Sequence, residues 1–221
     1  MGEKEFKETL AVKIFYSITK FLGSPFVKLI WVREVKGSEN LPKKGAFIVA
    51  SNHSSYFDFI SLISVFPRKI YFLAAEKFFK GKIWGLLVRL TGQIKVERES
   101  GEKKEVYSLA LSVLRQGKIL GIFPEGTRSP DGKINRYFTG VAKFALSAKV
   151  PVVPVGIIGA YKVLPRQNKF PKFKKVIEIK IGKQMDFSEY YNREQNEELF
   201  KEITDKIMEN VAELYGNNCC I

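Results

Sequence analysis

The chain contains few of the residues that form metal centres or disulfide frameworks. Its 221 residues include one histidine and two cysteines. Because Cys219 and Cys220 are adjacent near the C-terminus, they offer neither a disulfide framework nor the spacing of metal ligands. A lone histidine without clustered thiols or carboxylates also makes a poor metal site. We therefore expect no structural disulfide, no metal and a reduced, cytoplasmic setting.

Long apolar runs and leader-like segments are also missing. No stretch approaches the roughly 18 uncharged apolar residues that a membrane-spanning helix needs. The N-terminus carries mixed charge, as in Glu3-Lys4-Glu5, and no small-residue cleavage site follows an apolar stretch. The sequence thus predicts neither a spanning helix nor a cleaved leader.

Negative charge is scarce, since 37 Lys and Arg residues stand against 23 Asp and Glu, which gives a net charge of +14. This balance favours anionic partners: nucleic acid, anionic lipid, phosphorylated substrates or an acidic carrier protein. Nucleic-acid modules interleave basic residues with exposed aromatics, whereas aromatics such as Phe78-Phe79 lie here in apolar runs. No helix-turn-helix, RNP or zinc-finger signature is found, so we do not expect a nucleic-acid partner.

The N-terminal segment has the pattern of a membrane-surface element. Apolar residues recur on one helical face, and a turn signal at Gly23-Ser24-Pro25 is followed by a second apolar stretch over 26–32. With lysines off this face and Trp31 at its end, residues 1–33 predict two short amphipathic helices lying on an anionic membrane. The alternative is that this face packs on the domain's own core. The face comprises Phe6, Leu10, Ile14, Ile18, Phe21 and Leu22.

Residues 34–221 alternate short apolar runs with helical patterns, and their composition of 45% hydrophobic and 27% charged residues is that of a folded domain. Expected strands are 46–50, 70–74, 93–96, 119–123, 152–158 and 176–181. Expected helices are 57–65, 82–90, 104–115, 141–148 and 193–215. The alternation predicts an α/β fold with a mostly parallel sheet covered by helices. Ligands bind such sheets at the carboxyl ends of the strands, where residues 52–58 and 123–129 fall.

One candidate for general-base chemistry is the pair His53 and Asp58 in Asn-His-Ser-Ser-Tyr-Phe-Asp. A carboxylate on one ring nitrogen fixes the tautomer and lets the other nitrogen take a proton. Within one helix the two side chains would point about 140° apart. We therefore expect His53 in a loop and Asp58 in the first helical turn, with Ser54 or Ser55 as the N-cap. The alternative is a capping aspartate beside an incidental histidine.

Three further segments carry weaker signals. The turn Glu125-Gly126-Thr127-Arg128 offers exposed amides and a guanidinium that suits a phosphate, or it is a plain surface turn. The strand over 93–96 leads to Arg98 at the same edge, unless Arg98 is only a solvated charge. The prolines in 150–155 suggest either a rigid wall along an acyl chain or an edge strand.

All four segments together resemble the glycerolipid acyltransferase family, over about residues 33–185. The Asn-His-x-x-x-x-Asp motif is matched by Asn52, His53 and Asp58. The Gly-x-x-x-x-Asp-Arg motif is matched by Gly92 and Arg98, with Glu97 in place of Asp and Lys95 where an apolar residue is more usual. Phe-Pro-Glu-Gly-Thr-Arg-Ser is matched in full at 123–129, and Val-Pro-Val-Val-Pro-Val at 150–155.

This resemblance implies transfer of an acyl chain from acyl-carrier protein or coenzyme A to the 2-hydroxyl of 1-acylglycerol-3-phosphate, giving phosphatidic acid. It implies that His53 is the general base and that Asp58 orients it. The implied substrate-binding residues are Lys77, Gly92, Arg98, Glu125, Gly126, Thr127 and Arg128.

The resemblance further implies direct transfer without cofactor or acyl-enzyme. It places the enzyme, peripheral or monotopic, at the cytoplasmic face of the membrane. Another lysolipid acceptor and a catalytically silent lipid-binding protein stay open as alternatives.

Overall fold

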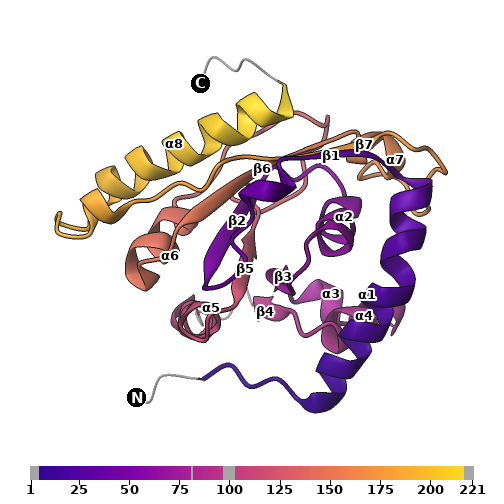
Figure 1. The fold of residues 1–221 in the computed structure, drawn as a ribbon, viewed down its shortest axis with the longest axis horizontal. Helices are drawn as coiled ribbons and strands as arrows, with labels where there is room; N and C mark the ends of the chain where they lie inside the picture. Colours follow the sequence, from indigo (N-terminus) through magenta and orange to yellow (C-terminus); the bar gives the residue numbers. More distant parts are fainter. Residues whose placement is uncertain (1–4, 81, 97–102, 217–221) are drawn as a thin grey trace.

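The computed structural model describes residues 5–80, 82–96 and 103–216. Its described strands form one sheet in the order β1-β7-β6-β2-β5-β3-β4 (Figure 1). Every neighbouring pair is parallel except β6 with β7. This confirms the α/β class with a mostly parallel sheet. The strands are β1 (Val32–Lys36), β2 (Phe47–Ser51), β3 (Ile70–Ala75), β4 (Ile94–Val96), β5 (Ile119–Ile122), β6 (Val152–Ile158) and β7 (Ile177–Ile181).

Helices cover both faces of the sheet because successive strand residues point to opposite sides. In β2, Ile48 and Ala50 pack under α5 (Lys103–Arg115), α6 (Gly140–Ala148) and α8 (Glu197–Tyr215). Phe47 and Val49 pack on the other side with α2 (Phe57–Val65) and α7 (Ala160–Val163). The short helices α3 (Lys77–Lys80) and α4 (Lys82–Leu90) link β3 to β4, and 3-10 turns lie at η1 (Ser38–Asn40) and η2 (Ser188–Tyr190).

The last helix begins later than the expected residue 193. The Asn196 side chain accepts a hydrogen bond from the Leu199 amide at 2.9 Å, so Asn196 is the N-cap. Glu197 and Glu198 then lie in the first turn, where the helix dipole favours negative charge. Gly216 ends the helix with a φ of 91°, which glycine adopts without strain.

The N-terminal helix is a single element, so the expected pair of helices with a break at Gly23-Ser24-Pro25 is wrong. Helix α1 (Leu10–Ile30) runs through Pro25 for 21 residues. A helical proline lacks an N–H and crowds the carbonyl four residues before it, here that of Phe21. Pro25 is exposed and Phe21 is 79% exposed, so water can solvate the carbonyl that loses its partner.

Helix α1 packs along the domain through one side and leaves its apolar side open. Tyr16 is buried, and Lys20 Nζ donates to the carbonyls of Phe66 and Pro67 at 2.6 and 2.8 Å. The alternative that the apolar face packs on the core is therefore wrong, except for Phe6, which contacts Tyr71 edge-on at 5.2 Å. The exposed residues, here called the α1 stripe, are Leu10, Ile14, Ile18, Phe21, Leu22, Phe26 and Leu29.

Helix α1 is also long and apolar enough to cross a membrane by length and composition. This corrects the expectation that no segment would qualify. In the sequence, lysines and the Gly-Ser-Pro turn signal interrupt the apolar residues of this segment, so the segment does not read as one continuous helix. In the structure, α1 runs along the right edge of the molecule and packs against α2, α4 and β1 (Figure 1).

Two segments of the sheet differ from the expected pattern. Strand β1, absent from the expected strands, pairs in parallel with β7, so the expected domain boundary between residues 33 and 34 falls inside it. Strand β6 lies inside the sheet between β7 and β2 and is therefore not an edge strand. Proline has no N–H to donate to a neighbouring strand. Pro154 is tolerated because the regular pairing of β6 with β7 ends at Val155, and the next contact on that side is an isolated bridge of Val152 with Met185.

Gly121 is the position in β5 where the sheet has no room for a side chain. A Cβ there would overlap the ring of Phe72, whereas a Cβ at Gly140, in α6, would meet nothing within 4 Å. We expect Gly121→Ala to lower the free energy of unfolding by about 1–3 kcal/mol through overpacking. Gly140→Ala should leave it unchanged or raise it by up to about 1 kcal/mol. Urea unfolding of both variants checks this, and equal stabilities would contradict the packing described here.

Candidate active site

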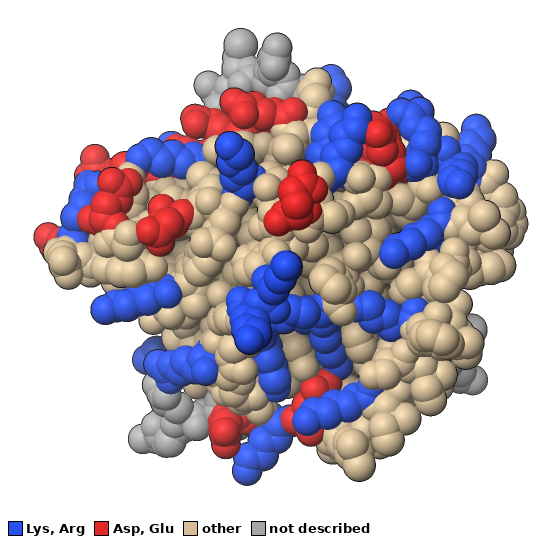
Figure 2. Space-filling model, viewed as in Figure 1, with Lys and Arg blue, Asp and Glu red and all other residues tan. Residues whose placement is uncertain are grey.

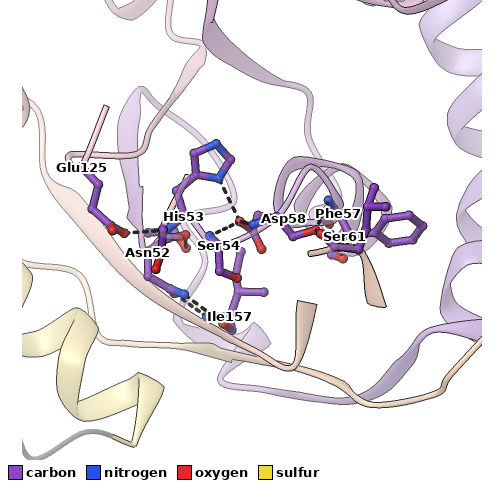
Figure 3. A network of polar contacts seen from close by, with 12 residues as sticks. Asn52, His53, Ser54, Phe57, Asp58, Ser61, Glu125 and Ile157 are labelled. Carbon is purple, nitrogen blue, oxygen red and sulfur yellow. Dashed lines mark hydrogen bonds and ion pairs between the residues drawn. The ribbon is translucent and has the colours of Figure 1, made fainter. Parts of the chain in front are cut away.

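The site lies where β2 ends, at the edge formed by the carboxyl ends of the parallel strands. Asn52 follows β2 and is buried. Its side chain donates to the carbonyl of Ile157 at 3.0 Å and accepts from the amide of Ile157 at 2.8 Å (Figure 3). This paired bond fastens the end of β2 to β6, so the next residue, His53, leaves the sheet at a fixed point.

Asp58 holds His53 through a compact set of hydrogen bonds. One carboxylate oxygen, Oδ2, accepts from His53 Nδ1 at 2.8 Å and from the amides of Ser54 and Ser55 at 2.7 Å each. Asp58 is fully buried in the first turn of α2, and His53 lies in the loop before it, as the spacing predicts. Because a carboxylate only accepts, the neutral ring carries its proton on Nδ1, and Nε2 points away from Asp58 (Figure 3).

Phe123, which follows β5, restrains the His53 ring from one side. The two rings stack with centroids 4.2 Å apart, and the Phe72 ring stacks on Phe123 with centroids 5.6 Å apart. His53 also borders a cavity of about 250 Å³ whose walls are mainly apolar. Its lining includes Tyr56, Phe59, Phe72, Val88, Ile122 and Phe123. The imidazole is therefore next to a space that suits a hydrocarbon chain.

Glu125 supports the backbone of the loop that carries His53. Its Oε1 accepts from the His53 amide at 2.7 Å, and its Oε2 accepts from the Asn135 amide at 3.1 Å. The side chain is only 2% exposed. Burial raises the pKa of Glu125 to about 7, with smaller contributions from Asp58 and Asp131, while the two amide bonds act in the opposite direction. Direct contact of Glu125 with an acceptor stays a prediction.

The turn after Glu125 places Arg128 beside the same loop. Gly126 has a φ of +64°, its amide donates to the Phe123 carbonyl at 2.9 Å, and it borders the cavity. Thr127 is exposed in this turn. The Arg128 guanidinium lies 3.5 Å from the centroid of the Tyr56 ring, and its Nη1 is buried without a hydrogen-bond partner among the described residues. Such a donor suits an anionic group.

A second cation, Arg166, lies near this turn and was not identified from the sequence. Burial, together with the repulsive charge of Arg166, lowers the pKa of Arg128, against the attraction of Tyr56. The Ser55 hydroxyl donates to the Leu164 carbonyl at 2.8 Å, which holds the segment before Arg166 against the His53 loop. The only signal in the sequence was the basic character of the segment, which has no motif.

Among the remaining expected residues, the structure describes the surroundings of Gly92 alone. Gly92 has a φ of +68° in the turn before β4. A Cβ placed on it would meet Val12, Lys69 and Glu8, which do not line the cavity. Its role in substrate binding stays a prediction. Lys77 begins α3 directly after β3, but its side chain lies outside the described residues, as do Arg98 and Glu97.

Clustered metal ligands are not found in the described ranges 5–80, 82–96 and 103–216. Besides Asp58, Glu125 is a carboxylate that contacts His53, and it accepts a hydrogen bond from the His53 backbone amide rather than from the imidazole ring. The chemistry available to the described side chains is thus proton transfer at His53 Nε2 beside an apolar cavity and a guanidinium.

Comparison with known proteins places this site in a family. The sequence profile described as Acyltransferase matches residues 32–158, which include the His53 loop, the Arg128 turn and β6. The chain belongs to the acyltransferase family. This agrees with the resemblance seen in its four motifs.

Relatives of this acyltransferase carry more specific names. A protein of Bacillus subtilis named 1-acyl-sn-glycerol-3-phosphate acyltransferase is 29% identical over 181 residues, covering 80% of this chain and 86% of the relative. The human 1-acyl-sn-glycerol-3-phosphate acyltransferase alpha is 30% identical over 131 residues, or 58% of this chain and 46% of the relative. The chain spans about half the length of several curated relatives that it matches.

A solved structure has the same fold. It is the 1-acyl-sn-glycerophosphate acyltransferase of Thermotoga maritima, with a TM-score of 0.69 and 30% identity, and the match covers 94% of this chain and 81% of that one. The likeness extends beyond the 32–158 match to nearly the whole acyltransferase chain described here.

The buried carboxyl of Glu125 predicts a pH dependence of stability. In the folded protein it keeps its proton up to about pH 7, but in the unfolded chain only to about 4.5. The stability from the neutral form is therefore complete below about 4.5 and is lost as pH rises through about 7, by roughly 3 kcal/mol. Glu125→Gln should lack this loss between pH 5 and 8 in urea unfolding.

The exposed Glu194 provides the matched control for this experiment, since Glu194→Gln removes the same charge outside the core. Its stability should follow that of the unmodified protein across the pH range. If Glu125→Gln and the unmodified protein lose stability in parallel as pH rises, the buried carboxyl is not the titrating group.

Proposed function

We propose that this protein transfers an acyl chain from an acyl thioester to the 2-hydroxyl of 1-acylglycerol-3-phosphate, which gives phosphatidic acid. The observation that carries this proposal is the arrangement of His53. Its Nδ1 is held by the buried Asp58 carboxylate, while its Nε2 is directed away from that carboxylate, beside an apolar cavity. The names of the relatives and the family membership support the same reaction.

The proposed step uses His53 as the general base. Its Nε2 takes the proton of the acceptor's 2-hydroxyl as that oxygen attacks the thioester carbonyl. The imidazolium that forms is stabilised by the Asp58 carboxylate at 2.8 Å. The tetrahedral intermediate then collapses, its C–S bond breaks, and the departing thiolate receives the proton from His53. Backbone amides near the site hold the oxyanion. No acyl-enzyme and no cofactor are needed for this sequence.

The acceptor's phosphate is proposed to bind Arg128. Its buried Nη1 has no hydrogen-bond partner in the described structure, and the stacking on Tyr56 fixes the plane of the guanidinium. A guanidinium can bond two phosphate oxygens at once, so this geometry favours a phosphate over a neutral headgroup. Arg98 and Lys77 remain proposed partners from the family motif, as do Gly92, Gly126 and Thr127 in shaping the acceptor site.

An acyl chain is proposed to occupy the 250 Å³ cavity. The cavity opens beside His53, so a chain inside it would bring its carbonyl or hydroxyl end to Nε2. Burial of a hydrocarbon chain contributes about 0.8 kcal/mol for each CH₂. This favourable term would position the reacting end of the lipid without any polar contact along the chain.

The α1 stripe is proposed to dock the enzyme on the cytoplasmic face of an anionic membrane, as a peripheral or monotopic protein. Burial of Tyr16 and the Lys20 bonds to the Phe66 and Pro67 carbonyls attach the helix to the domain. Spanning the bilayer would require these contacts to break, whereas lying in the interface keeps them. The donor, acyl-carrier protein or acyl-coenzyme A, is anionic and matches the net charge of +14.

The reaction is tested with purified protein, vesicles containing 1-acylglycerol-3-phosphate, and either donor, with phosphatidic acid followed by mass spectrometry. The unmodified protein should form product, and His53→Gln should lose at least about a hundredfold in kcat because the general base is gone. Comparing the two donors identifies the carrier. Arg128→Ala should raise the KM for the acceptor, whereas the exposed Arg136→Ala is the matched control and should not.

Two results would count against the proposal. No product with either donor, despite vesicle binding, would exclude 1-acylglycerol-3-phosphate and favour another lysolipid acceptor or a silent lipid-binding protein. Full activity of His53→Gln would exclude the general base.

Docking through α1 is tested with the double variant Phe21→Ser and Leu22→Ser. Both side chains are exposed, so the thermal unfolding midpoint should stay within a few degrees of the unmodified value. Removing two large apolar groups from the interface should lower vesicle affinity by at least about tenfold. Co-sedimentation with vesicles measures this, and unchanged binding would mean that the α1 stripe faces something other than lipid.

A further inference from the structure

The loop between α7 and β7, residues 165–175, exposes large aromatic side chains. Phe170 is 80% exposed and Phe173 is 76% exposed. The same loop carries five cations and no carboxylate, in the sequence Pro-Arg-Gln-Asn-Lys-Phe-Pro-Lys-Phe-Lys-Lys. We propose that this loop is a second membrane-contact element, which inserts its aromatic rings at the surface of an anionic bilayer beside α1. The proposal rests on the proposed docking through α1 and adds a separate contact to it.

The loop is held in a defined position against the end of α1. The Lys172 amide donates to the Val163 carbonyl at 2.8 Å, and the Trp31 indole Nε1 donates to the Lys172 carbonyl at 2.8 Å. Phe173 stacks on the Trp31 ring with centroids 5.6 Å apart. In Figure 1 the segment after α7 lies next to the C-terminal end of α1. Its exposed rings therefore belong to a structured surface.

This surface continues that of α1. Phe26, in the last turns of the α1 stripe, contacts Trp31 edge-on at 6.0 Å, and Trp31 in turn carries Phe173. Three rings thus connect the exposed helix to the exposed loop. Leu29, 70% exposed, lies in the same helical end. Aromatic and aliphatic groups side by side are what the boundary between headgroups and acyl chains accommodates.

The charges of the loop fit an anionic partner. All five cations are exposed, and within the described residues none of them forms an ion pair with a carboxylate. Figure 2 shows Lys and Arg gathered at the upper right of the molecule, where α7 and the end of α1 lie in Figure 1. The cations are Arg166, Lys169, Lys172, Lys174 and Lys175.

A bilayer fits these features better than a nucleic acid does. Single-stranded nucleic acids stack their bases on aromatic rings, but most of the α1 stripe beside this loop is leucine and isoleucine, which provide no stacking surface. Basic side chains around inserted rings combine the two forces that hold peripheral proteins on anionic lipid. The observations therefore favour a lipid surface.

The second contact would orient the active site. The loop begins just after Leu164, whose carbonyl accepts from the Ser55 hydroxyl in the His53–Asp58 segment at 2.8 Å. One helix on a membrane leaves the domain free to roll about the helix axis. A second contact beside one end of that helix removes this freedom, and it holds the edge of the sheet that carries His53 at a fixed height above the lipid.

The test compares two matched pairs of lysines. Lys174→Gln with Lys175→Gln removes charge from the loop, while Lys43→Gln with Lys44→Gln removes the same charge from an exposed turn before β2, at the opposite edge of the sheet. Vesicles of phosphatidylglycerol and phosphatidylcholine are used at about 0.1 M salt. The loop pair should lower vesicle affinity by about tenfold or more, and the control pair should leave it nearly unchanged. Phe170→Ser should lower it severalfold.

Two further conditions separate the contributions. With pure phosphatidylcholine vesicles, the loop lysines should no longer matter, whereas Phe170→Ser should still reduce binding. Activity is also measured with a short-chain 1-acylglycerol-3-phosphate that is dissolved as single molecules. The loop variants should keep their turnover there and lose it on vesicles.

Several outcomes would overturn the proposal. One is vesicle binding by the loop variants equal to that of the unmodified protein, and another is an equal loss in the control pair. A third is binding of a single-stranded oligonucleotide that the loop substitutions abolish while vesicle binding stays. Failure of the unmodified protein on the soluble acceptor would instead contradict the proposed reaction, and the vesicle comparison would still decide the role of the loop.

Discussion

The site depends on one buried carboxylate. Asp58 Oδ2 accepts three hydrogen bonds, from the His53 ring and from two consecutive backbone amides, in a residue with no exposed surface. An unpaired carboxylate in that position would be strongly unfavourable, so the loop must close around it. The same bonds that make Asp58 tolerable in the interior set the tautomer and direction of the imidazole. Stability and chemistry therefore share one set of contacts.

The sheet supplies the fixed frame around this carboxylate. The end of β2 is fastened to β6 by the paired bonds between Asn52 and Ile157, and the start of the loop is held by Glu125, which follows β5. The Phe123 ring stacks on the imidazole of His53. Two parallel strands, β2 and β5, thus deliver a base, its support and an arginine to one edge, and the parallel strand β6 anchors the end of β2. The α1 stripe and the 165–175 loop, which begins next to the His53–Asp58 segment, present apolar and basic groups that we assign to the membrane.

The local part of this arrangement follows from the sequence, and the part that depends on tertiary contacts does not. His53 and Asp58 are five residues apart, so helix geometry alone places one before the helix and the other in its first turn. Short, continuous apolar runs such as those of β2 and β5 predict buried strands from the sequence alone. By contrast, Pro25 predicts a helix break, yet α1 continues past it, because one side of the helix packs on the domain and water solvates the other side. Glu125 reads as a substrate contact, but its bond to the His53 amide joins residues 72 positions apart. The interior position of β6 also depends on tertiary contacts. Its regular pairing with β7 starts at Val155, so the missing N–H of Pro154 removes no hydrogen bond from that ladder, and the sequence alone does not reveal this.

The presence of a single histidine makes the central claim directly measurable. With ¹⁵N-labelled histidine, the imidazole signals of the protein can come only from His53. In the neutral ring, the account predicts a protonated Nδ1, with its proton shifted downfield by the hydrogen bond to Asp58, and an unprotonated Nε2. Asp58→Asn should abolish the downfield proton and lower kcat by orders of magnitude. A neutral ring protonated on Nε2 in the unmodified protein would contradict the account, because His53 could not then accept the hydroxyl proton at that atom.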